Sequence, residues 1–254
     1  MHKIYLVFIS LLMYSCSHSQ EQVAEYNVLT SKRSIEIKPD SLLLNRIPGD
    51  NYSITKSIVK KQRISLSKLY SKLSDSAQKN SFLDSASQLF DSLLLNRLVP
   101  YWYGTEWDFN GHTSKPNVGK IACGYFVSTT LRDMGLNLNR YELAKKGPED
   151  EANSVAIFQA YTSVTPSDSI HEKLNSIPNG LYFVGLDNHV GYLYKEKGNT
   201  YFLHSNYIAN KVMIEPTSTF VAFESSTYYI SSISKNRKLI EKWLTYSKVE
   251  IVGE

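Results

Sequence analysis

The sequence has few cysteines, no long apolar run beyond its first residues and no dense cluster of basic residues. Only Cys16 and Cys123 occur among the 254 residues, and the formal net charge is +4. After residue 16 no stretch of 18 consecutive apolar residues follows, so no membrane-spanning helix is expected there. The scattered Lys and Arg argue against a nucleic-acid-binding surface. No residues have metal-ligand spacing, so we expect neither a metal nor another cofactor.

Apolar and aromatic residues, by contrast, are abundant. The chain is 42% hydrophobic and 12% aromatic, with 18 tyrosines. That composition is sufficient for a buried core, and the length fits one domain with additions. The tyrosines of the second half favour half-buried strands.

Residues 1–15 have the layout of an export signal. Lys3 precedes an apolar run, Ile4–Tyr14, that is too short to cross a bilayer as a stable helix. The junction Leu-Met-Tyr-Ser-Cys then resembles the lipobox of bacterial lipoproteins. This resemblance implies that Cys16 is lipidated and that the protein is anchored in the cell envelope, at the outer membrane or the periplasmic face. The alternative is an ordinary signal peptide in which Cys16 is incidental.

The remaining chain divides into two parts. Residues 16–60 are polar and mixed, and we expect a tether with an N-terminal extension; residues 61–254 are expected to form the main domain. Apolar spacings of three and four predict helix over 64–98, short strands are expected from residue 180, and a helix is expected over 234–248. An α+β fold is therefore predicted, and we expect a monomer.

Cys123 stands where a helix is expected to begin. Val127, Leu131 and Met134 follow at helical spacing, and Gly135 is a natural C-terminal stop. Free backbone N–H groups at a helix start favour a thiolate and can hold an oxyanion, so we expect Cys123 to have a lowered pKa. With Cys16 lipidated, Cys123 has no disulfide partner; a buried, inert cysteine is the alternative.

A thiolate nucleophile needs a base, and two histidines lie in strand-like runs. His189 begins the run 188–195 and His204 lies in the run 200–206, with a hairpin turn between them. A two-residue loop places His189 opposite Asn206, whereas a four-residue loop places it opposite His204. We favour the four-residue loop. Both registers put the three side chains on one face of the hairpin. The alternative is that the histidines are structural and satisfied by backbone carbonyls.

Several blocks together resemble the NlpC-type cell-wall peptidases. They are the segments Pro100–Thr105, Cys123 at its helix start, Gly135–Arg140, His189–Leu193 and Leu203–Ser205. The resemblance covers about residues 80–230 and rests on the order and spacing of the blocks.

This resemblance implies a papain-like α+β fold in which the cysteine helix packs on an antiparallel sheet. It further implies hydrolysis of peptide bonds in peptidoglycan, with Cys123 as nucleophile, His189 as base and His204 as the orienting third residue. Tyr101 matches a tyrosine that lines the family's site, and we expect Tyr101 and Asn206 to contact the substrate.

The sequence departs from the family around the nucleophile. Ala122 and Gly124 replace an Asp and a Ser, and Tyr125 replaces a glycine. The segment between Gly104 and Cys123 is also longer than usual. Two other functions therefore stay open: an amidase or acyltransferase on the same scaffold, or an inactive envelope lipoprotein.

Overall fold

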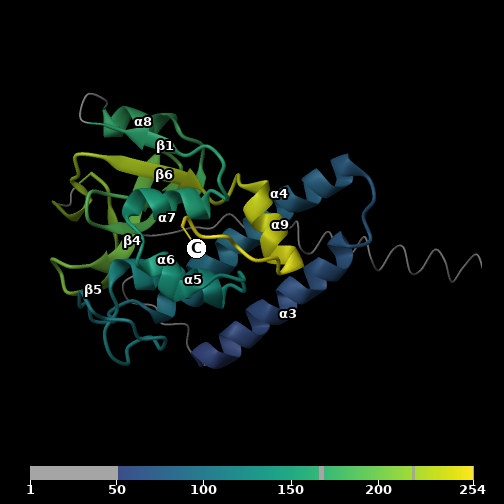
Figure 1. Cartoon of the computed structure of the whole chain (residues 1–254), viewed down its shortest axis with the longest axis horizontal. Coiled ribbons are helices and arrows are strands. Elements are labelled where there is room, and N and C mark those ends of the chain that lie inside the picture. The colour runs from purple at the N-terminus through teal and green to yellow at the C-terminus, as the bar shows by residue number, and fades with distance from the viewer. Residues whose placement is uncertain (1–50, 166–168, 219–220, 254) are drawn as a thin grey trace, which may run out of the picture. The chain divides into compact units, whose positions relative to one another are not determined.

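The computed structural model describes residues 51–253 with gaps at 166–168 and 219–220 (Figure 1). All of these residues belong to one compact unit, Glu36–Glu254. The expected signal segment and the expected lipidation site at Cys16 lie outside the described residues.

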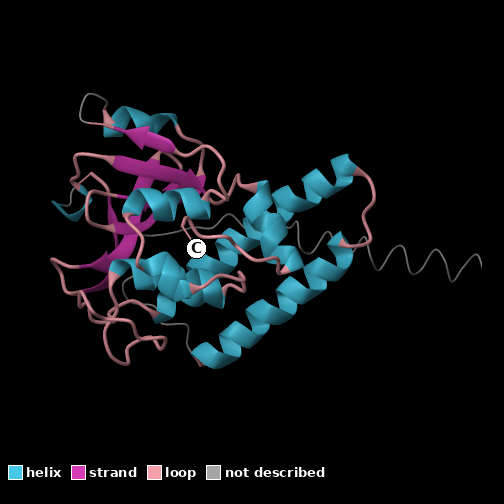
Figure 2. Cartoon of the chain, viewed as in Figure 1, coloured by secondary structure: helices cyan, strands magenta, loops and turns pink. Residues whose placement is uncertain are grey.

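The described chain starts with helices and ends in an antiparallel sheet closed by one more helix (Figure 2). In chain order the elements are α3 (Tyr52–Tyr70), α4 (Ser76–Leu93), a π-helical turn (Leu94–Leu98), a 3-10 turn (Val99–Tyr101), α5 (Cys123–Asp133), α6 (Arg140–Ala144), α7 (Pro148–Val155), β1 (Thr162–Val164), α8 (Ile170–Ser176), β2 (Gly180–Gly185), β3 (Val190–Glu196), β4 (Asn199–Asn206), β5 (Lys211–Pro216), a 3-10 turn (Val221–Phe223), β6 (Tyr228–Ser232) and α9 (Arg237–Thr245).

The sheet has six strands in the order β1-β6-β2-β3-β4-β5, and every neighbouring pair is antiparallel. Helices α5 and α7 pack against it, α5 on β3 and β4 and α7 on β2 and β6. Helices α3, α4 and α9 pack against one another beside this layer (Figure 1). The predicted α+β class is confirmed.

The hairpin between β3 and β4 corrects the predicted register. Tyr192 pairs with Leu203 and Glu196 with Asn199, so Lys197 and Gly198 alone form the loop. Their φ angles are 50° and 82°, as a two-residue type I′ turn requires. The four-residue loop was the wrong choice, because Lys197 adopts the left-handed conformation that usually falls to Asn or Asp.

The N-terminal helices also differ from the prediction. The helix expected over 64–98 is broken into two, because Asp75 caps a new helix by accepting the N–H groups of Ala77 and Gln78. Helix α3 begins at Tyr52 and so crosses the expected domain boundary at residues 60 and 61. Its Tyr52 hydroxyl donates to Asp133 at 2.7 Å, at the end of α5, so the helix is part of the folded unit.

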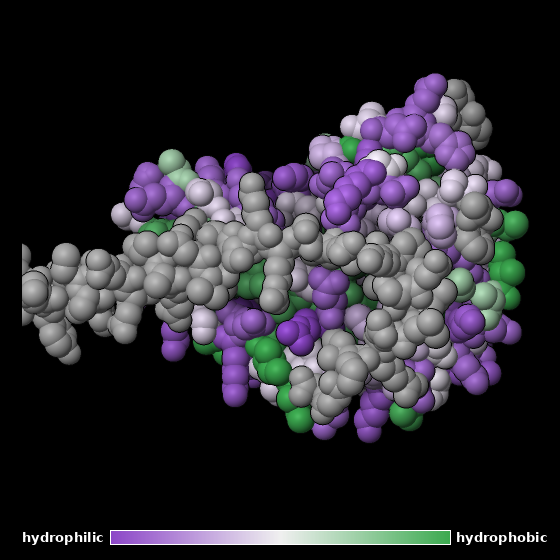
Figure 3. All heavy atoms as spheres, turned by 180° about the vertical axis from the view of Figure 1, so that it is seen from behind, coloured by the Kyte–Doolittle hydropathy of each residue, from purple (hydrophilic) through white to green (hydrophobic). Residues whose placement is uncertain are grey.

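Polar residues dominate the described surface on the face seen in Figure 3, where apolar side chains occur in small patches. Within the described ranges no helix is long and apolar enough to span a bilayer.

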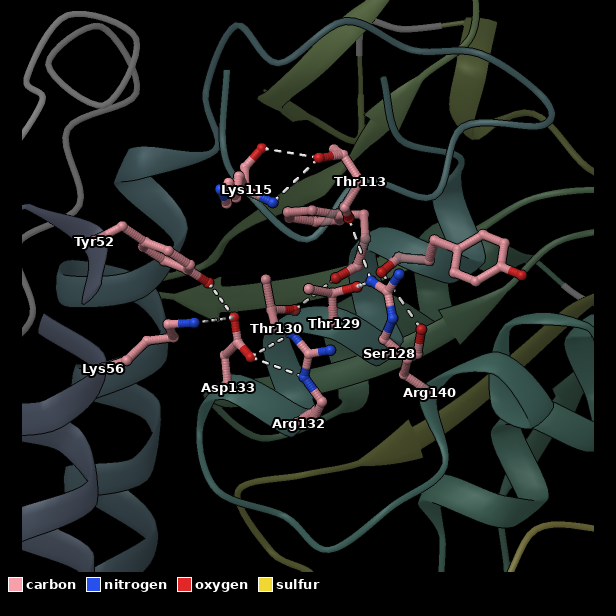
Figure 4. A network of polar contacts seen from close by, with 12 residues as sticks. Tyr52, Lys56, Thr113, Lys115, Ser128, Thr129, Thr130, Arg132, Asp133 and Arg140 are labelled. Carbon is pink, nitrogen blue, oxygen red and sulfur yellow. Dashed lines mark hydrogen bonds and ion pairs between the residues drawn. The ribbon is translucent and has the colours of Figure 1, made fainter. Parts of the chain in front are cut away.

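A buried arginine ties the long segment before Cys123 to helix α5. Arg140 is 4% exposed and donates to the Thr129 hydroxyl at 2.6 Å and to the carbonyl of His112 at 2.6 Å. A third bond reaches the carbonyl of Thr113 at 3.2 Å (Figure 4). The same figure shows Asp133 between Tyr52 and Arg132, at the other end of the helix. Each polar partner of Arg140 would lose its bond without the guanidinium.

We therefore expect Arg140→Met to lower the free energy of unfolding by about 2–4 kcal/mol, because buried acceptors are left unpaired. Urea denaturation followed by circular dichroism measures this. Arg237→Met is the matched control, since it removes an ion pair with Asp84 that is half exposed on both sides. Equal shifts for the two variants would contradict the structural role of Arg140.

Candidate active site

A cleft of about 650 Å³ opens where the start of α5 meets the β2–β3 turn. Three aromatic residues, Trp107, Phe109 and Tyr207, contribute to its lining, as does the α6–α7 segment. The residues that line it are Trp107, Phe109, Ala122, Cys123, Gly124, Tyr125, Ala144, Lys146, Pro148, Glu151, Leu186, Asp187, Asn188, His189, Val190, Tyr207, Ala222, Glu224 and Ser225. The predicted nucleophile and the predicted base thus face the same cavity.

Cys123 is the first residue of α5, as the sequence predicts. Ala122 precedes it in an extended conformation and offers no side-chain cap, so the first N–H groups of the helix are not taken up by an N-cap side chain. The backbone N–H groups of Val190, Gly124 and Cys123 itself point to the sulfur and lower its pKa. Residual exposure of Cys123 opens onto the cleft.

The pKa of the Cys123 thiol is nevertheless raised, so the lowered pKa expected from the sequence is wrong. Burial is the largest cause and raises the pKa of Cys123 to about 11, and the carboxyl group of Glu151 raises it further. The N–H groups act as expected but are outweighed. In the free protein at neutral pH, Cys123 is therefore a thiol rather than a thiolate.

His189 and His204 are in direct contact. The Nε2 atom of His189 lies 2.7 Å from Nδ1 of His204, and the two side chains are 5% and 0% exposed. Phe202 stacks on the His204 ring at a centroid distance of 4.0 Å. Gly191 makes room for the stacked Phe202 and His204 rings, because a Cβ there would lie 2.9 Å from the Cβ of His204. Burial lowers the pKa of His189 well below its usual value and that of His204 to about 3, so both rings are neutral.

The turn that carries His189 is held from both sides. The carbonyl of His189 accepts the N–H of Leu186 at 2.7 Å, which closes the β2–β3 turn. Asp187 accepts the N–H groups of Ser226 and Thr227 at 2.7 and 3.0 Å. These bonds hold the pKa of Asp187 below its usual value. Hydrogen bonds on both sides of the β2–β3 turn therefore hold the backbone that carries the His189 imidazole.

Two buried hydroxyl groups fix the nucleophile helix on the strands that carry the histidines. The hydroxyl of Tyr192 on β3 lies 2.8 Å from the Thr130 hydroxyl and donates to the Val127 carbonyl at 3.1 Å. Ser205, next to His204 on β4, donates to the carbonyl of Ile121 at 2.7 Å. Both ends of the Cys123 region are thus tied to the hairpin.

The two predicted substrate contacts do not line the cleft. Tyr101 is the last residue of the 3-10 turn Val99–Tyr101 and is not among the residues that line the cleft. Its hydroxyl lies 3.0 Å from the hydroxyl of Thr55, and its ring packs on Tyr52. Asn206 is 3% exposed and bonds to Glu215 at 3.3 Å. Both residues make contacts within the fold, and the long segment before Cys123 contributes Trp107 and Phe109 to the cleft instead.

Sequence reasoning missed two buried carboxyl groups at the site. Glu151, on α7, lines the cleft and is 2% exposed; burial raises its pKa well above the usual value. Glu215, on β5, lies 3.0 Å from Nε2 of His204. The alternation of β5 puts Glu215 on the face that carries the histidines, but only a known strand order could reveal it.

Comparisons with protein-family models, curated proteins and solved structures find no match for this chain. Within the part of the chain that the structure describes, no three His, Cys, Asp or Glu side chains gather as metal ligands would. The chemistry of the site therefore has to follow from its own geometry.

The neutral thiol predicts a distinct alkylation profile. Because burial raises the pKa of Cys123 to about 11, the thiolate population should increase steadily above neutral pH. We expect the rate of alkylation by iodoacetamide to rise about tenfold per pH unit between pH 7 and 10. Mass spectrometry of the Cys123 peptide measures the rate.

Glu151→Gln provides the control for this measurement. Where Glu151 is ionised, its charge disfavours the thiolate, so the variant should shift that part of the profile to lower pH. A rate that is flat from pH 5 to 8 would instead indicate a preformed thiolate–imidazolium pair and contradict the prediction.

Proposed function

We propose that this protein is an exported cysteine hydrolase that cleaves amide bonds, with Cys123 as nucleophile, His189 as general base and His204 as its orienting partner. One observation carries the proposal: Cys123 at the start of α5 and the bonded His189–His204 pair border the same cleft. The packing of α5 on the antiparallel sheet supports a papain-like arrangement.

The neutral state of both groups defines the first step. Nε2 of His189 is engaged with His204, so Nδ1 is the nitrogen left for the thiol proton. As the sulfur attacks the amide carbonyl, Nδ1 takes that proton and an S–C bond forms. Proton transfer and attack are then coupled, because neither buried group is stable as an ion beforehand. N–H groups at the start of α5 would hold the oxyanion.

The remaining steps return the enzyme to its starting state. The His189 imidazolium donates its proton to the leaving nitrogen as the C–N bond breaks, which leaves an acyl-enzyme on Cys123. Water then attacks the thioester carbonyl while His189 accepts a water proton. That proton passes to the departing sulfur and regenerates the thiol.

Peptidoglycan stem peptides are the substrate class we propose, on the basis of the sequence resemblance. The cleft supports it in two ways. Its volume of about 650 Å³ suits a few peptide residues, and its lining carries opposite charges, on Lys146 and Glu224. Stem peptides carry both carboxylates and amines. Lipidation at Cys16 would keep the enzyme at the envelope, beside this substrate.

Replacement of the nucleophile tests the activity. We expect Cys123→Ser to abolish release of peptide fragments from purified peptidoglycan, as followed by mass spectrometry, while the circular dichroism spectrum stays unchanged. A serine is close in volume but far less reactive in this environment. Activity at a tenth or more of the wild-type level would remove Cys123 from the mechanism. No fragment release from the wild-type protein would favour the non-enzymatic lipoprotein.

The orienting residue can be distinguished from its neighbour. His204→Ala should lower kcat on the order of 10²-fold or more, because an orienting residue fixes the tautomer and position of the base. Asn206→Ala should lower it much less, since Asn206 bonds to Glu215 and to the N–H groups of Ile208 and Ala209 rather than to either imidazole. The readout is kcat on a synthetic stem peptide. The opposite order of effects would refute the assignment of His204.

A further inference from the structure

The polar chain that starts at His189 does not end at His204. Nε2 of His204 lies 3.0 Å from Oε1 of Glu215, on the neighbouring strand β5. Glu215 is 2% exposed, and its other oxygen, Oε2, has no hydrogen-bond partner among the residues that the structure describes. Burying a carboxyl oxygen without a hydrogen-bond partner lowers the stability of the fold. A group kept at that cost is a candidate for a functional role.

The orientation of the Asn206 amide is fixed by its backbone contacts. Its Oδ1 accepts the N–H groups of Ile208 and Ala209 at 2.7 and 2.8 Å. A backbone N–H can only donate, so the oxygen of the amide must face these groups. The Nδ2 amino group then points to Glu215 and donates to Oε1 at 3.3 Å. Oε1 therefore acts as an acceptor.

The same logic extends to both rings. When Glu215 is ionised, neither of its oxygens carries a hydrogen, so His204 holds its own hydrogen on Nε2 and donates it to Oε1. Because the ring is neutral, Nδ1 of His204 is then a bare acceptor. Across the 2.7 Å contact, His189 must donate from Nε2. Its Nδ1 is thus left without a hydrogen, which is the form that can take a proton from Cys123.

We propose that Glu215 is a positioning residue that fixes the tautomer of His189 through His204, so that Nδ1 of His189 is the basic nitrogen. This inference rests on the proposed function for its consequence in catalysis. The tautomer itself is a property of the folded chain and can be measured whether or not the protein hydrolyses a peptide.

Protonation of Glu215 would reverse the direction of the hydrogen bonds between Glu215, His204 and His189. A hydrogen on Oε1 can be donated to Nε2 of His204, which moves the ring hydrogen to Nδ1 and, in turn, the His189 hydrogen to its own Nδ1. Burial raises the pKa of Glu215 to about 7. By the alternation of the three strands, the titratable or charged side chains on the shared face are His189, His204, Lys195 near the end of β3 and Lys211 at the start of β5. Lys195 is bonded to the carbonyls of the α8 end rather than to Glu215. Tyr207 borders His189. The carboxylate form is lost as the pH falls through 7.

Nitrogen NMR of the full chain with ¹⁵N-labelled histidine tests the tautomer directly. At pH 8 we expect His189 to show a bare Nδ1 and a hydrogen-bearing Nε2. Glu215→Met should destroy this preference, because Nε2 of His204 loses its acceptor. Glu215→Gln should retain it, since the Asn206 amino group still selects an oxygen at that position. A hydrogen on Nδ1 in the wild type, or an unchanged spectrum in Glu215→Met, would overturn the inference.

Kinetics provide the second readout. Glu215→Met should lower kcat on the order of 10²-fold with little change in KM, by analogy with enzymes in which the base is held in the wrong tautomer. Wild-type kcat/KM should decrease as the pH drops below about 7, and Glu215→Gln should remove this decrease. Asp91→Asn is the matched control, because burial also raises the pKa of Asp91 to about 7 although it bonds to Ser234, outside the cleft. This control should keep the decrease.

The two readouts separate the possible failures. If the wild-type chain hydrolyses no peptide, the proposed function fails, and the NMR result alone decides the role of Glu215. If hydrolysis depends on Cys123 but the decrease below about pH 7 survives in Glu215→Gln, the function stands and the inference is wrong.

Discussion

The hydrogen bonds that two buried hydroxyl groups make across the α5–sheet interface are the constraint on which the site depends. The nucleophile comes from a helix and the histidines come from a hairpin, so their separation is set by how the helix lies on the strands. Tyr192 fixes the middle of α5 from β3, and Ser205 fixes the residue before Ala122 from β4. Holding reacting groups in a fixed arrangement makes a bimolecular step effectively unimolecular. A shift of α5 along the sheet would change the position of Cys123 relative to His189 without unfolding either element.

Burial, rather than the helix dipole, controls the electrostatics of this site. A helix N-terminus contributes about 0.3–1 kcal/mol toward a negative charge, which is less than one pKa unit. Burial of a group can shift its pKa by several units. The raised pKa of Cys123 and the lowered pKa values of His189 and His204 all follow from this inequality. The site holds neutral groups that exchange a proton during attack, and the direction of that exchange depends on hydrogen positions rather than on fixed charges.

The sequence predicted those parts of the site that depend on local periodicity. Helical spacing after Cys123 located α5, and the period of two along the hairpin placed His189 and His204 on one face, where they are in contact. The register was wrong because the turn type depends on whether Lys197 tolerates a positive φ, which composition does not reveal. Glu151 and Glu215 were missed for a different reason. Each enters the site from a separate element, α7 or β5, and no spacing in the chain relates them to Cys123.

The unusual residues around Cys123 have a structural explanation. A Cβ at Gly124 would lie 2.9 Å from the Ala144 carbonyl and 3.0 Å from Oε1 of Glu151, so a larger residue such as serine would not fit here without a shift of its neighbours. The glycine lets the α6–α7 segment approach the start of α5, and that approach brings Glu151 to the cleft. The residues around Cys123 thus act together: Gly124 leaves room for a buried carboxyl group beside the thiol, and Ala122 leaves the first N–H groups of α5 without a side-chain cap.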